Sequence, residues 1–108
     1  MRIIEKQPGA HVDYCLEGTR IVFRGGELAL DLARYVRDYP VHLIVSENEY
    51  GMLVLGPAHR YVAELDLPAR AYTVEKGEAD DIGFPRLYRH PVPFDLSSAS
   101  LTLWAMEG

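Results

Sequence analysis

The length of 108 residues corresponds to one domain, and we treat residues 1–108 as a single domain. The hydrophobic share of 48% and the charged share of 25% exclude a wholly disordered chain, a collagen-like repeat and a disulfide scaffold. The net charge is −5 at neutral pH. Since phosphate binding draws on an excess of Lys and Arg, this charge argues against nucleic acid and anionic membranes as partners.

A cytoplasmic location is expected from three features of the sequence. The chain has a single cysteine, Cys15, so no disulfide can form within it. The start, Met1 to Ile4, lacks the long apolar core of a signal peptide. No apolar run approaches the roughly 20 residues of a membrane span.

Frequent turn signals divide the chain into short runs and predict a mainly β protein. We expect an antiparallel sheet folded as a small barrel or sandwich with one short helix. In chain order, the first strand is Val12 to Leu16, in which Val12, Tyr14 and Leu16 share one face. A turn at Glu17-Gly18 leads into the next run, Thr19 to Arg24.

Residues 27–39 fit two structures. As a hairpin arm, 27–32 pairs with 19–24 across Gly25-Gly26. That register places Arg20 opposite Asp31 and also matches apolar residues on one face, so we favour it, followed by a helical turn over 33–38. The alternative is one helix over 27–39, which would make the fold α+β.

The second half of the chain is expected to be strands joined by turns. The hairpin with arms 41–46 and 52–55 has apolar residues on both faces, so we expect both faces to be buried, one by the core and the other by a second structure. The acidic segment is read as a solvated loop. The expected elements are the hairpin arms 41–46 and 52–55, the strands 60–65, 70–75 and 101–106, and the loop 75–83.

The sequence contains only weak motifs for metal binding or catalysis. His11, Asp13 and Cys15 have strand spacing and are competent zinc ligands, but i and i+4 on a strand lie about 13 Å apart, too far to share one ion. They are therefore only weak metal candidates. Arg86 to His90 is the one basic stretch that carries an aromatic residue, and it is read as balancing the acidic loop before it. No phosphate loop, dinucleotide fingerprint or nucleophile elbow is present, so no cofactor and no catalytic residue is predicted.

The function favoured by the sequence is a non-catalytic interaction module that binds itself or another protein, rather than an enzyme. Seven tyrosines and the doubly apolar hairpin supply large apolar side chains suited to interfaces or pocket walls. The candidate interface or pocket residues are Leu43, Val45, Tyr50, Leu53, Tyr61 and Trp104. Two alternatives stay open: a small β-barrel that binds a small molecule, with or without enzymatic activity, and a metal-binding protein.

Overall fold

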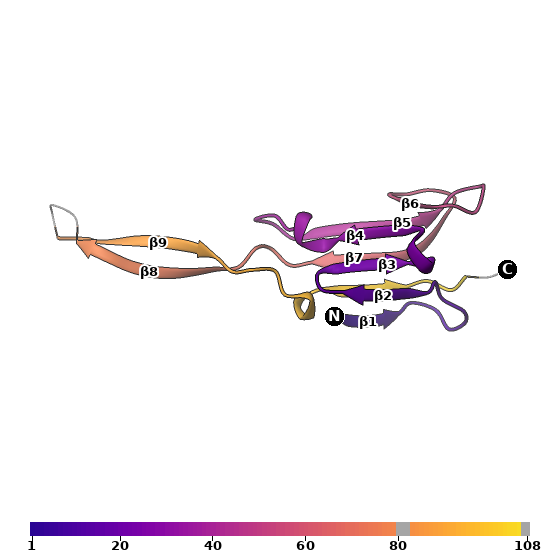
Figure 1. Ribbon diagram of the computed structural model, residues 1–108, viewed down its shortest axis with the longest axis horizontal. Helices are drawn as coiled ribbons and strands as arrows, with labels where there is room; N and C mark the ends of the chain where they lie inside the picture. Colours follow the sequence, from indigo (N-terminus) through magenta and orange to yellow (C-terminus); the bar gives the residue numbers. More distant parts are fainter. Residues whose placement is uncertain (80–82, 107–108) are drawn as a thin grey trace.

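The computed structural model describes residues 1–79 and 83–106 and shows a mainly β protein (Figure 1). Within these ranges the strands form three sheets, and no helix exceeds three residues. The strands are β1 (Arg2–Glu5), β2 (Tyr14–Glu17), β3 (Arg20–Phe23), β4 (Leu28–Asp31), β5 (Val41–Glu47), β6 (Leu53–Leu55), β7 (Arg60–Leu67), β8 (Tyr72–Ala79), β9 (Pro85–Pro91) and β10 (Ser100–Leu103). The 3₁₀ turns are η1 (Arg24–Gly26), η2 (Leu32–Arg34) and η3 (Leu96–Ser98).

The largest sheet has five strands in the order β1-β10-β7-β5-β6. Its pairs are antiparallel except β1 with β10, which run parallel and bring the first and last strands of the chain together. The β5–β7 pairing shifts register between Val45 and Ser46, at a β-bulge. The sheet is therefore built mostly from contacts between residues far apart in the sequence.

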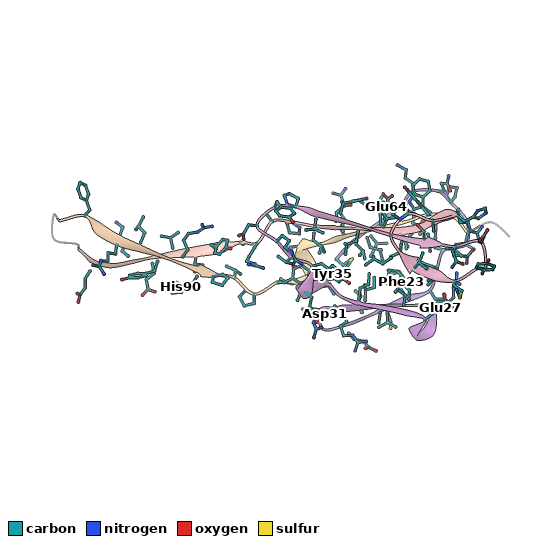
Figure 2. The ribbon with its side chains drawn as sticks, turned by 90° about the horizontal axis from the view of Figure 1, so that it is seen from above. Phe23, Glu27, Asp31, Tyr35, Glu64 and His90 are labelled. Carbon is teal, nitrogen blue, oxygen red and sulfur yellow. The ribbon has the colours of Figure 1, made fainter. Side chains whose placement is uncertain are left out.

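The second sheet, β2-β3-β4, lies against the five-stranded sheet and makes a sandwich (Figure 1). Phe23 points from β3 into the space between the two sheets (Figure 2) and is fully buried. The other buried apolar residues form one cluster with it. They are Val12, Ile21, Leu30, Leu32, Val36, Val45, Leu53, Val62, Ala63, Leu65, Leu67, Ala99, Leu101 and Leu103.

The predicted hairpin is confirmed in its register. Arg20 pairs with Asp31 and Phe23 with Leu28, which places charge pairs and apolar pairs as expected. Gly25 and Gly26 both have positive φ angles, 67° and 108°, which is why this turn takes two glycines.

The alternative of one helix over 27–39 is wrong. Residues 28–31 are a strand, and the expected helical turn over 33–38 is only the three-residue η2. The Asp31 carboxylate accepts a bond from the Ala33 amide and also from the Thr19 hydroxyl at 2.8 Å. Asp31 thus closes the hairpin and starts η2, so pairing overrides the good helix propensity of this segment.

Of the two expected arrangements, a barrel or a sandwich, the described residues form the sandwich. Two other expectations need correction. The expected loop 75–83 is strand as far as Ala79, and 80–82 lie outside the described residues. The last strand ends at Leu103. The strands β1 and β9 were not predicted from the sequence.

An ion-pair network joins the two layers of the sandwich. The Glu47 carboxylate on β5 accepts from Arg24 of η1 at 2.6 Å and from Arg60 of β7 at 2.8 Å. Glu27, beside Arg24, accepts from the backbone amide of Leu53 on β6. The bonds of Arg24 and Glu27 connect the turn of the small sheet to β5 and β6, and the bond of Arg60 joins β7 to β5 within the large sheet.

Replacing Glu47 by Gln is expected to lower the free energy of unfolding by about 1–2 kcal/mol at neutral pH. The hydrogen bond from Arg24 is the main cause that holds the pKa of Glu47 below its usual value of 4.5. The contribution of the Glu47 carboxylate to the free energy of unfolding is therefore present above pH 4.5 and is lost as the pH falls through the lowered pKa. Urea titrations should show the difference between wild type and variant shrinking in acid. Glu49→Gln, in the exposed turn two residues on, is the matched control.

The third sheet is the hairpin β8–β9, called the arm below, which projects from the sandwich (Figure 1). The molecule measures 68 × 23 × 21 Å and its radius of gyration is 18.7 Å. A compact domain of this length has a radius of gyration of about 13 Å. The arm accounts for this elongation.

Candidate functional site

The arm is anchored at its root by polar contacts with the segment that follows η2. The Tyr72 hydroxyl donates to the Asp38 carboxylate. The Arg70 amide donates to the Arg37 carbonyl at 2.7 Å, and the Arg70 guanidinium donates to the Val36 carbonyl at 3.1 Å. The arm therefore leaves the sandwich in a defined direction.

The two faces of the arm follow from its register. Val74 pairs with Arg89 and Lys76 with Leu87, so these four side chains share one face. On the same face the Arg89 guanidinium stacks over the Tyr72 ring, with its central carbon 4.0 Å from the ring centroid. This face combines apolar and cationic groups.

The opposite face carries Glu75, Tyr88 and His90. The His90 Nε2 atom lies 3.0 Å from the Glu75 carboxylate, across the two strands. The Tyr88 ring lies against the backbone of Gly77, where a β-carbon would collide with its Cε2 atom. Gly77 is thus the residue that lets an aromatic ring cover this strand.

Apolar side chains of the arm are open to solvent. Val74 and Leu87 are each 61% exposed, and Tyr88 is 47% exposed. β8 and β9 pair with each other and with no further strand of residues 1–79 and 83–106. A two-stranded hairpin in water is marginally stable by itself, so an arm of this kind gains from a partner that covers it.

The predicted interface residues on the β5–β6 hairpin lie in different environments. Val45 is fully buried and Leu53 is 7% exposed, so both belong to the protein's own core and are not surface residues. Leu43 is partly buried against that core. Tyr50, in the turn between the strands, is 78% exposed. Since the core itself covers one face of this hairpin, its apolar composition does not require a partner on that face.

The other two predicted residues, Tyr61 and Trp104, meet edge to face on the outer side of the large sheet. Their ring centroids are 5.9 Å apart, and the Lys6 ammonium lies 5.6 Å from the centre of the Trp104 ring. The Trp104 indole donates to the Glu64 carboxylate at 2.7 Å. The sequence placed both aromatic residues among the candidates but contained no signal that they would touch.

His42 forms a polar cluster with two carboxylates on the same outer face. Its Nδ1 atom lies 2.6 Å from Asp66 and its Nε2 atom 2.9 Å from Glu64. Because both partners are acceptors, the doubly protonated ring satisfies both contacts. The hydrogen bond to Asp66 is the main cause that raises the pKa of His42 above 6.5. No sequence pattern indicates this cluster, since His42 occurs in an otherwise apolar run.

The cluster predicts a pH dependence of stability. Because the pKa of His42 is raised, its contribution to the free energy of unfolding is complete below pH 6.5 and is lost as the pH rises through the pKa of the folded state. Replacing His42 by Gln should therefore flatten the fall of the unfolding midpoint as the pH rises above 6.5. Urea unfolding across this range measures it, with His59→Gln in the turn after β6 as control. Equal slopes in wild type and His42→Gln would contradict the prediction.

The weak metal candidates His11, Asp13 and Cys15 do not share one strand. β2 begins only at Tyr14, so His11 and Asp13 precede it. The His11 ring bonds to the Gln7 carbonyl at 2.8 Å, and Cys15 is exposed. In the described part of the chain, no three His, Cys, Asp or Glu side chains are grouped so that they could hold a metal ion.

An apolar cavity of about 210 Å³ lies at the root of the arm. Val36, Ala71, Val92 and Phe94 are among its lining residues. Small-molecule sites usually have about 300–1,000 Å³, so this cavity is smaller than a typical ligand pocket. Its lining residues come from the segment after η2, from the residues just before β8 and from those just after β9. Contacts among them hold the root of the arm against the sandwich.

Comparisons with known proteins give no family for this chain. No protein-family model, no curated protein and no solved structure matches it. Among the described residues, no helix is long and apolar enough to cross a membrane.

Proposed function

We propose that the protein is a non-catalytic interaction module that associates with itself, and that the arm is its contact element. The observation that carries this proposal is the arm's exposure. An anchored two-stranded hairpin extends from the sandwich with Val74 and Leu87 open to solvent. We also propose a cytoplasmic location, which the single exposed thiol of Cys15 supports because such compartments keep thiols reduced.

Self-association is supported over an internal role because the sandwich already has its own core. Among the described residues, fifteen buried apolar residues form one cluster between the two sheets, and none of residues 72–78 and 86–91 belongs to it. The apolar side chains of the arm therefore serve no core packing in the single chain. A second copy that lies beside the arm would remove part of their surface from water.

The test is the oligomeric state of untagged protein by native mass spectrometry and light scattering. Wild type should be an oligomer, and Val74→Asp/Leu87→Asp should be a monomer with an unchanged unfolding midpoint. The matched control is Met52→Asp/Leu55→Asp, which places the same charges on exposed apolar residues of the sandwich and should leave the oligomer intact. A wild-type monomer at its highest soluble concentration, with or without a retained small molecule, would overturn the proposal.

A further inference from the structure

The two edges of the arm differ in charge. β8 carries Glu75, Lys76 and Glu78, so carboxylates outnumber the ammonium group. β9 carries Arg86, Arg89 and His90 and has no acidic residue. Each strand has one edge that no other strand of the described chain occupies. An open edge presents backbone N–H and C=O groups to another strand.

These charges distinguish the ways in which two arms can pair. A two-fold pairing of β9 with β9 places the two arginines of that strand, Arg86 and Arg89, against the same arginines of the other copy. A two-fold pairing of β8 with β8 places a net acidic strand against itself. Like charges on opposed strands are destabilising. Only the pairing of β8 with β9 of a second copy joins strands of opposite charge.

We propose that the arm binds a second copy of this chain by edge-to-edge strand pairing, β8 of one copy with β9 of the next. This inference rests on the proposed self-association and names its geometry. Because β8 and β9 are antiparallel within the arm, the pairing continues one antiparallel sheet from copy to copy. The contact is head-to-tail, so it builds a closed ring or an open filament and never a two-fold dimer.

The internal register of the arm shows how the charges would meet if it were repeated between copies. Glu75 would face Tyr88 of the next copy, with Arg86 and His90 as its diagonal neighbours on the same face. Lys76, on the other face, would face Leu87 and have Arg89 as a diagonal neighbour, so the attraction in this register comes from Glu75. Pro85 and Pro91 lack an N–H group and therefore limit pairing along the β9 edge to residues 86–90.

The lengths of the strands indicate that the partner of the arm is a second arm and not an edge strand of the sandwich. β8 has eight residues and β9 seven, whereas β1, β2 and β4 have four each and β6 has three. A long strand on a three- or four-residue edge would leave half of its backbone groups unpaired. An arm of equal length pairs with all of the 86–90 edge.

Charge reversal on one strand at a time tests the geometry in the full chain. Glu75→Lys/Glu78→Lys makes both edges basic, and Arg86→Glu/Arg89→Glu makes both acidic. For each variant alone, the protein concentration at which half of the chains are assembled should rise about tenfold or more. An equimolar mixture of the two variants should assemble at the wild-type concentration, with copies of the two variants alternating. The decisive variant carries all four changes. It again has edges of opposite charge and should assemble as wild type does.

The results separate this inference from the proposed function. Glu17→Lys/Glu49→Lys, two exposed residues of the sandwich, is the control for net charge and should assemble normally. If wild type assembles and the fourfold variant does not, head-to-tail edge pairing is wrong. If every variant assembles as wild type does, self-association stands but uses another surface. A monomeric wild type overturns both proposals.

Discussion

Replacing Phe23 by Ala is expected to lower the free energy of unfolding by about 3–5 kcal/mol. The ring is fully buried between the two sheets, and its strand neighbours Tyr14 and Leu28 pack against the same core. A chain of this length is stable by roughly 5–15 kcal/mol, so the loss removes a large fraction of the total. The shift of the urea unfolding midpoint, at constant m-value, measures it.

The matched control for this change is Tyr50→Ala. It removes an aromatic ring of similar size from a side chain that is 78% exposed, so its effect should stay within about 0.5 kcal/mol. If Phe23→Ala cost no more than this control, the space between the sheets would not be a packed core, and the sandwich would be wrong.

Replacing Leu53 by Asp is expected to unfold the sandwich or to destabilise it by more than about 3 kcal/mol. The side chain is nearly buried, so the new carboxylate would lose most of its hydration. Its own backbone amide already donates to the Glu27 carboxylate at 2.9 Å, so the change also brings a second negative charge close to the first. Circular dichroism and the urea midpoint report the outcome.

The adjacent residue supplies the control for Leu53→Asp. Met52 is 54% exposed, and Met52→Asp should leave the unfolding midpoint almost unchanged. A folded Leu53→Asp protein that lost only its self-association would contradict the burial described above, and it would restore the β5–β6 hairpin as the interface.

The candidate site was only partly predictable from the sequence. Large aromatic residues were recognised as interface candidates, and Tyr61 with Trp104 do form one contact on the outer sheet face. The apolar pattern of the β5–β6 hairpin did not reveal that Val45 and Leu53 face the core. The strand predicted over 70–75 overlaps the first part of β8. The rest of the arm was not predicted because Glu75 to Gly83 is acidic, and a charged run is read as a loop unless its partner strand is known.

The local pairing of neighbouring strands can be predicted from the sequence alone. The β3–β4 register follows from charge and apolar pairs a few residues apart and from two glycines that accept positive φ angles. Three features become visible only in the folded chain: the parallel pairing of β1 with β10, the outer-face cluster of His42, and the projection of the arm. These features depend on which distant strands pair. A strand's own residues do not specify its partner, because many strands share the same alternation of apolar and polar residues.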